Sequence, residues 1–210
     1  MIKHLQRYFR ISLLLVFFFT SFNCLAAGSV KHPFADSTKT DTPWYKKLSV
    51  IAEYQYFKTC HHSRFDGGYA FVDYNATANF AMGLGIAYDY STLHIDNGYN
   101  LRHVKVLPVL ADFRYVPFAN WIVCPFAVAD VGYSTFIKYE QEDPTHVEST
   151  RNVTDRGLYT FGGGGVLVKL NHKVTLYTTA GFTGMHMSFN NLDVNPRGLS
   201  NQIGVKVNLQ

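Results

Sequence analysis

The chain has 210 residues, enough for one domain, and a formal net charge of +4. Three of its cations, Lys3, Arg7 and Arg10, lie close to the N-terminus, so the remainder is nearly neutral and no nucleic-acid-binding surface is expected. Aromatic residues make up 16%, and the 14 tyrosines and 16 glycines are spread over many short segments. This composition is typical of an all-β protein with aromatic belts.

Residues 1–27 have the pattern of a secretory signal peptide. A basic stretch precedes an apolar stretch, 11–19, that is too short to span a membrane as a helix, and small residues follow at Ala26 and Ala27. The alternative is a lipoprotein signal with Cys24 acylated. No long apolar run follows, so the exported chain is predicted to be either soluble or a closed barrel.

The rest of the chain divides into a lead-in and a series of strands. We expect 28–45 to be a periplasmic lead-in, with Trp44 and Tyr45 as interfacial anchors, and 46–210 to be the barrel domain. Alternating side chains and turn residues predict eight strands in that domain. They are expected at about 46–57, 68–76, 80–93, 101–115, 121–138, 156–170, 173–189 and 199–210.

The third of these strands shows the alternation most clearly. One face carries large apolar or aromatic residues and the other carries Ala81, Gly83, Gly85, Ala87 and Asp89. A wall that is bulky on one side and small on the other suits a narrow barrel with lipid outside. A soluble lipocalin-like barrel, the alternative, would place the large apolar residues inside.

The connections between the strands alternate between long and short. Longer polar connections follow the first, third, fifth and seventh strands, and tight turns such as 77–79 and Asn171–His172 follow the others. This asymmetry is typical of outer-membrane barrels, so we expect 58–67 and 139–155 to be extracellular loops that contact a ligand, a host surface or a small apolar solute. Alternation fails around Lys105 and Pro108, where we expect a bulge.

Two segments, LPVLADFRY (107–115) and PFAVADVGYS (125–134), resemble the small outer-membrane β-barrel domain family of Gram-negative bacteria, especially Bacteroidetes. Its members are similar to OmpA, OmpX and OmpW. The resemblance implies an all-β, eight-stranded antiparallel, up-and-down transmembrane β-barrel, monomeric in outer-membrane lipid. It implies a non-enzymatic scaffold without cofactor. Such barrels usually end in an aromatic residue that the insertion machinery reads, whereas Gln210 ends this sequence, an atypical assembly signal.

Eight charged residues are expected on the inward faces of the strands. The interior of an eight-stranded barrel is just filled by side chains, and buried charges must be paired. We therefore expect a salt-bridged plug, with a proton or ion path as the alternative, and a general porin is disfavoured because it needs about twice as many strands. The eight residues are Glu53, Asp73, Asp89, Asp112, Arg114, Asp130, Lys169 and Lys206.

Two further groups of residues contain side chains or spacings found in binding sites. Cys60, His61 and His62, with His94 and His146 from other loops, have ligand chemistry for a transition metal, but adjacent histidines point apart on an extended chain. We expect solvated loop residues and no metal. The run 162–165 is all glycine, yet lacks the Lys-Ser/Thr of a phosphate loop. Cys60 and Cys124 are expected to be free thiols.

The strongest enzymatic indication is His186 with Ser188, which share one face of a strand, so that a base could activate a hydroxyl. Together with 190–191 and 195–199, the pair resembles the end of the outer-membrane lipid A 3-O-deacylase family. In that family an acid on the last strand completes the His-x-Ser pair, and Ser200 stands at that position here. We therefore predict no hydrolase activity, with a lipid A deacylase using His186 and Ser188 as the alternative.

Overall fold

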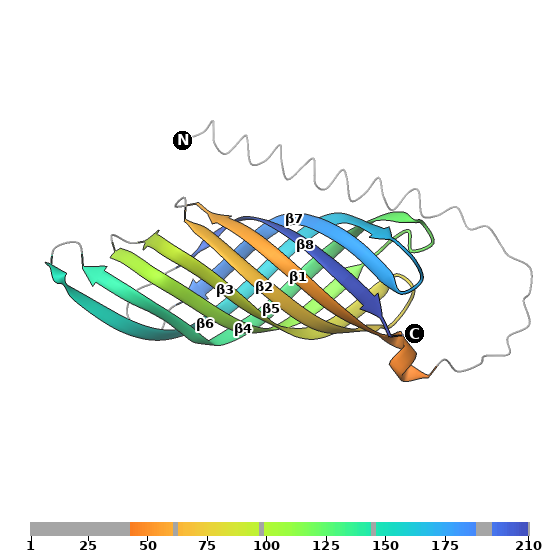
Figure 1. Ribbon diagram of the computed structural model, residues 1–210, viewed down its shortest axis with the longest axis horizontal. Helices are drawn as coiled ribbons and strands as arrows, with labels where there is room; N and C mark the ends of the chain where they lie inside the picture. Colours follow the sequence, from red (N-terminus) through yellow and green to blue (C-terminus); the bar gives the residue numbers. More distant parts are fainter. Residues whose placement is uncertain (1–42, 61–62, 97–98, 144–145, 188–194, 210) are drawn as a thin grey trace, which may run out of the picture. The chain divides into compact units, whose positions relative to one another are not determined.

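The computed structural model describes residues 43–60, 63–96, 99–143, 146–187 and 195–209. They form a 3-10 helix, η1 (Trp44–Lys47), and eight strands (Figure 1). No helix in this part of the chain is long and apolar enough to cross a membrane. The strands are β1 (Leu48–Thr59), β2 (Arg64–Asn75), β3 (Phe80–Asp96), β4 (Tyr99–Tyr115), β5 (Val123–Asp143), β6 (His146–Lys169), β7 (Val174–Met187) and β8 (Arg197–Asn208).

The strands follow one another around a closed barrel in chain order. Each is antiparallel to the next, and β8 returns to pair with β1 from Ser49↔Asn208 to Thr59↔Gly198. The predicted eight-stranded antiparallel up-and-down barrel is thus confirmed. The expected signal peptide, Cys24 and most of the lead-in lie outside the described residues.

Side chains alternate between the inside and the outside of the barrel as their period predicts. In β3, Leu84 is 69% exposed and Ile86 is 58% exposed, whereas Ala87 is buried. The glycines of this strand make room for larger side chains of β2. A Cβ at Gly83 would collide with the carboxylate of Asp73, and one at Gly85 with the ring of Phe71. The small inward face therefore follows from close packing in a narrow lumen.

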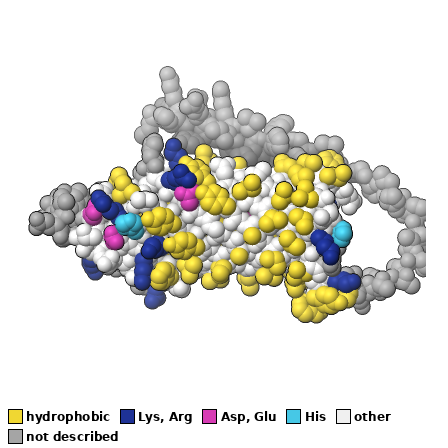
Figure 2. Space-filling model, in the orientation of Figure 1, with side chains coloured by type: hydrophobic (Ala, Val, Ile, Leu, Met, Phe, Trp, Pro, Cys, Tyr) yellow, Lys and Arg dark blue, Asp and Glu magenta, His cyan; other side chains and the backbone are white. Residues whose placement is uncertain are grey.

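The outside of the barrel is covered by an apolar belt, which the space-filling view shows on one face (Figure 2). Its members come from all eight strands. Few charged side chains lie among them on the outside of the barrel. Lysine and arginine instead gather towards the two ends (Figure 2). The belt includes Val50, Tyr54, Val72, Tyr74, Met82, Leu84, Ile86, Tyr88, Leu107, Val109, Phe113, Tyr115, Val131, Tyr133, Leu158, Val166, Leu176, Phe182, Leu199 and Ile203.

The two ends of the barrel differ in how the strands are joined. At the turn end lie η1, the short β2–β3, β4–β5 and β6–β7 connections, and the end of β8; at the loop end lie the other connections. Neighbouring turns at the turn end are tied together. Asn79 donates its Nδ2 to the carbonyls of Val116 (2.7 Å) and Pro117 (3.0 Å), and the Lys169 ammonium donates to the carbonyl of Ala119.

Several expected connections are shorter than the sequence suggested. The expected loop 58–67 is largely strand, because β1 runs to Thr59 and β2 begins at Arg64, and the expected loop 139–155 is largely the β5–β6 hairpin. Figure 1 shows this hairpin running beyond its neighbours. Past the apolar belt, polar side chains occupy the outside too. The alternation of apolar and polar residues therefore ends before the backbone hydrogen bonding between the strands does.

The irregularity expected in the fourth strand is confirmed. The β4–β5 register shifts between Arg102 and Lys105 and again between Leu107 and Pro108. His103, inside the first shift, has a φ of 51°, an uncommon backbone conformation for a residue other than glycine. The expected hairpin turn Asn171–His172 is longer than predicted, since β6 ends at Lys169 and β7 begins at Val174.

Candidate functional site: the barrel interior

An acid–arginine cluster crosses the interior on the turn-end side. Arg114 of β4 is at its centre. Its Nε lies 3.0 Å from both carboxylate oxygens of Asp112, and its Nη2 donates to Glu53 of β1. The hydroxyl of Tyr177 donates to the same Glu53 oxygen, and the Arg114 guanidinium lies 4.8 Å from the centroid of the Tyr177 ring. All four side chains are buried, so the contacts are shielded from water.

The remaining members of this cluster are Asp73, Asp130 and Lys206. The Lys206 ammonium lies 3.5 Å from Asp73 Oδ2 and donates to Asn75 Oδ1 at 2.8 Å. Asp130 is the cross-strand partner of Asp112, and no described group donates a hydrogen bond to either of its carboxylate oxygens. The cluster therefore holds four carboxyl groups against two cations.

The structure divides the eight residues that were expected to form one charge network. Six of them, Glu53, Asp73, Asp112, Arg114, Asp130 and Lys206, lie in the acid–arginine cluster. Lys169 lies at the turn-end rim, where it bonds the Ala119 carbonyl, and Asp89 belongs to a separate hydrogen-bond network.

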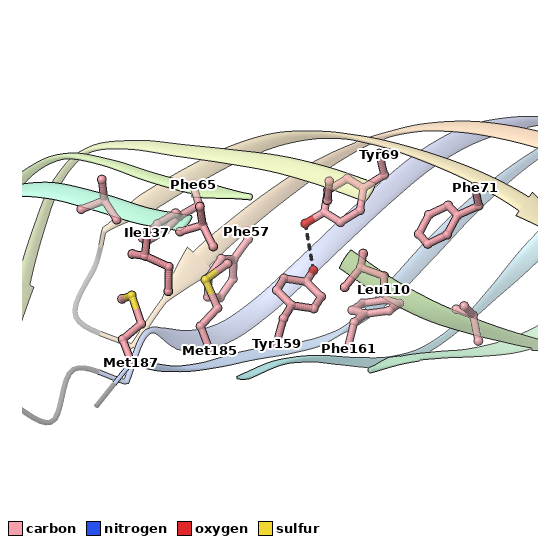
Figure 3. Close-up of a cluster of buried hydrophobic side chains, with 14 of the residues drawn as sticks. Phe57, Phe65, Tyr69, Phe71, Leu110, Ile137, Tyr159, Phe161, Met185 and Met187 are labelled. Carbon is pink, nitrogen blue, oxygen red and sulfur yellow. Dashed lines mark hydrogen bonds between the residues drawn. The ribbon is translucent and has the colours of Figure 1, made fainter. Parts of the chain in front are cut away.

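That second network runs across the middle of the barrel. Asp89 accepts hydrogen bonds from the Tyr69 hydroxyl, 2.8 Å from both carboxylate oxygens, and the Tyr69 hydroxyl lies 2.8 Å from the Tyr159 hydroxyl (Figure 3). Gln55 Nε2 donates to Tyr159 at 3.1 Å, and Gln202 Nε2 donates to Gln55 Oε1 at 2.9 Å. Side chains of five strands are thereby joined across the lumen.

An apolar plug fills the interior on the loop-end side. Phe57 of β1 and Phe65 of β2 are cross-strand partners whose ring centroids lie 5.4 Å apart. This aromatic filling was missed in the sequence, although the alternation that places Gln55 inside also places Phe57 inside. The plug consists of Phe57, Phe65, Leu101, Val104, Ile137, Met185 and Met187, several of which are labelled in Figure 3.

The residues weighed as metal ligands do not form one site among the described residues, where no three His, Cys, Asp or Glu side chains are grouped to hold a metal ion. The expectation that His94 is a solvated loop residue is wrong. It lies at the end of β3 with its side chain buried, and its Nδ1 is 3.0 Å from Ser63 Oγ. His61 and His62 lie outside the described residues, and His146 begins β6.

The two described cysteines lie at opposite ends of the barrel wall. Cys60 follows β1 at the loop end and is exposed, whereas Cys124 is buried near the start of β5 at the turn end. Both are free thiols, as expected. Cys124 Sγ lies 3.1 Å from the Phe118 carbonyl and 3.0 Å from that of Trp121, so it closes the β4–β5 turn.

Two positions of the deacylase alternative, 186 and 200, lie on different sides of the wall. His186 of β7 is exposed on the outside, and its Nδ1 contacts the side-chain oxygen of Asn195. Ser200, at the position of the missing acid, is buried inside the barrel opposite Gly181. Ser188 lies outside the described residues. Position 200 therefore faces away from His186, and an acidic side chain there would point into the lumen.

A cavity of about 500 Å³ opens at the turn end. Arg114, Tyr177 and Phe126 line it on the interior side, and η1 and the β2–β3 turn line its rim. Five of its lining residues are cationic: Lys46, Lys47, Arg114, Lys169 and Lys206.

Comparisons with known proteins concern the fold. Neither a protein-family profile nor a curated protein matches the sequence. Several solved structures are similar, including these three. The first is the N-terminal β-barrel domain of Pseudomonas aeruginosa OprF (12% identity, 76% of this chain and 96% of that one, TM-score 0.42). The second is Neisserial surface protein A (14% identity, 77% of this chain and 96% of that one, TM-score 0.45). The third is Ail, the attachment invasion locus protein of Yersinia pestis (10% identity, 76% of this chain and 95% of that one, TM-score 0.44).

Proposed function

We propose that this protein is a monomeric, non-enzymatic scaffold of the outer membrane, which spans the lipid as a barrel and presents its loop end at the cell surface. The observation that carries the proposal is the inverted polarity of the barrel. Charged Glu53, Asp112 and Arg114 are buried inside, while large apolar side chains are exposed on every strand. In water such a continuous apolar surface promotes association, whereas in lipid it is the stable arrangement.

The exposed cations and aromatic residues at the two ends of the barrel support its residence in the membrane. Just beyond the apolar belt at the loop end, six strands place a lysine or arginine on the outside, and we call this set the cation collar. Anionic lipid headgroups attract such side chains, while exposed Trp44, Tyr45 and Trp121 at the turn end are typical of an interface anchor. The collar consists of Lys58, Arg64, Lys105, Lys138, Arg156 and Arg197.

The filled lumen favours a scaffold over a conduit. The plug, the Asp89–Tyr69–Tyr159 network and the acid–arginine cluster follow one another through the barrel, and each is buried. A solute would have to displace all three. The tips of the β1–β2 and β5–β6 hairpins are instead the surfaces that we propose meet a ligand or host surface.

Cys60 allows this proposal to be tested with the native chain. We expect a membrane-impermeant maleimide, added to intact Gram-negative cells that produce the protein, to label Cys60, because this thiol is exposed at the loop end. The labelled protein is expected in the outer-membrane fraction. Its unheated band in detergent gels is expected to move on boiling, because a closed barrel resists the gel detergent until it is heated.

Two variants provide controls for this labelling. Cys60→Ala should abolish the signal, since Cys124 is buried. Lys173→Cys in the Cys60→Ala background places a thiol at the exposed turn end and should react only after the outer membrane is opened. A chain that is soluble and monomeric without detergent would refute membrane residence, and labelling of Lys173→Cys alone on intact cells would reverse the orientation.

We further expect no lipid A deacylase activity. His186 does face outwards, where an acyl chain lies, but its Nδ1 contacts the Asn195 amide and the side chain at position 200 points inside. In the deacylase pattern the acid on the last strand orients the imidazole, and loss of that acid typically lowers the rate by orders of magnitude. Incubation of the purified protein with lipid A should release no fatty acid by mass spectrometry. Release that is lost in His186→Ala would establish the alternative.

A further inference from the structure

At the turn-end cavity the packed lumen gives way to an open space of small-molecule size. Its volume of about 500 Å³ lies in the range of small-ligand sites. It is blind, because Phe71, Leu110 and Phe161 are buried deeper in the barrel. A molecule that enters at the turn end would therefore be held and not passed through.

Charge is distributed asymmetrically around this space. All five charged lining residues, Lys46, Lys47, Arg114, Lys169 and Lys206, are cationic, and no acidic side chain of the described chain lines the cavity. The carboxylates of Glu53, Asp73 and Asp112 lie one layer deeper and are at most 7% exposed. An occupant would thus meet ammonium and guanidinium groups directly, and carboxylates only behind them.

The lining cations retain hydrogen-bond donors. An ammonium has three donors. Lys169 uses one on the Ala119 carbonyl, and Lys206 uses one on Asn75 while it pairs with Asp73. The bonds of Arg114 to Asp112 and Glu53 come from Nε and Nη2, which leaves Nη1, and Arg114 itself is only 5% exposed. Free donors on a buried guanidinium and two amines suit an anion with several oxygen acceptors.

The rim of the cavity is also fixed in advance. Asn79 holds the β4–β5 turn through two carbonyls, Asn75 Nδ2 donates to the Lys47 carbonyl at 2.8 Å, and Lys169 holds Ala119. A preformed rim reduces the entropy lost when a ligand is ordered.

We propose that the turn-end cavity binds one small anion carrying phosphate or carboxylate groups. The site would select for several acceptor oxygens within reach of Lys46, Lys169 and Arg114. This inference does not depend on which end of the barrel faces the cell surface, since the cavity belongs to the barrel itself.

The test uses the purified full-length barrel in a non-ionic detergent and isothermal titration calorimetry. Inorganic pyrophosphate and citrate are titrated separately, so that the two arms distinguish phosphate from carboxylate chemistry. We expect saturable one-to-one binding in at least one arm, weakened by added salt. Lys46→Gln and Lys169→Gln should each weaken it about two- to fivefold, and roughly tenfold or more together.

Lys173→Gln is the matched control, since this lysine is exposed at the same end of the barrel but does not line the cavity. Its affinity should equal that of the unaltered protein. The Lys169→Gln variant also loses the hydrogen bond to the Ala119 carbonyl, whereas Lys46→Gln removes no such rim contact, so its loss of affinity reports on binding and not on folding. The heat-shifted gel band reports the fold of every variant. Absence of saturation in both arms, equal losses in Lys173→Gln and Lys169→Gln, or tighter binding of spermidine than of either anion would each overturn the proposal.

Discussion

Replacing Arg114 with methionine is expected to lower the free energy of unfolding by about 3–5 kcal/mol, because it leaves buried carboxylates without their cation. Arg114 contacts Asp112 and Glu53, and its Nε is 3.8 Å from Asp73. Methionine fills much of the space but supplies no charge or donor. Reversible urea unfolding of the barrel in lipid vesicles, followed by tryptophan fluorescence and by the unheated gel band, measures the change.

Arg64→Met is the matched control for this experiment. Arg64 also pairs with an acid, Asp66 at 2.8 Å, but its side chain is 62% exposed on the outside of the barrel. A surface pair contributes about 1 kcal/mol or less. In addition, Asp112→Asn in the Arg114→Met background should recover part of the loss, since it removes one uncompensated charge. If Arg114→Met cost no more than Arg64→Met, the cluster would not be an important source of stability.

Truncation of Phe57 to alanine is expected to cost about 3–5 kcal/mol, since it opens a void in the apolar plug. The ring is fully buried and packs on Phe65 from the neighbouring strand. Because the residues of the plug come from five strands, the surrounding structure cannot collapse fully into the gap. The same urea titration measures the loss.

A graded series separates packing from other causes. Phe57→Leu keeps most of the apolar volume and should cost less than half as much as Phe57→Ala. The exposed Leu199 on β8 lies on the outside, where lipid can refill the space left by Leu199→Ala without leaving a cavity. A cost for Phe57→Ala as small as that for Leu199→Ala would mean that the plug is loosely packed.

The sequence was sufficient for the strand number, their order and the side on which most residues lie. The reason is that a period of two is enforced wherever one face meets an apolar medium. It was also sufficient for the irregular stretch near Lys105 and Pro108. The ends of the strands, as at Thr59 and Arg64, could not be predicted as well. Beyond the apolar belt both faces of a strand are polar, and only backbone pairing marks the strand.

The interior was only partly predictable. Charged residues such as Glu53 and Arg114 could be assigned to the lumen by parity, since lipid excludes them. Their partners could not, because contacts across a barrel depend on register: Asp89 bonds Tyr69, not Arg114, and Lys169 bonds a turn carbonyl. Phenylalanine and tyrosine occur both inside and outside the barrel. Residue type alone therefore does not show that Phe57 and its neighbours face the lumen.

The seam between β1 and β8 has a consequence for how the barrel assembles. Every other strand pairing is a local hairpin, whereas this one joins the two ends of the barrel sequence, and so carries the largest loop-closure entropy. Until it forms, two strand edges expose unpaired amide and carbonyl groups, which are costly in lipid. The contacts Gln202–Gln55, Tyr177–Glu53 and Lys206–Asp73 also reach to or across this seam. Closure and interior packing are therefore one cooperative step, and a half-built sheet has neither its polar networks nor protected edges.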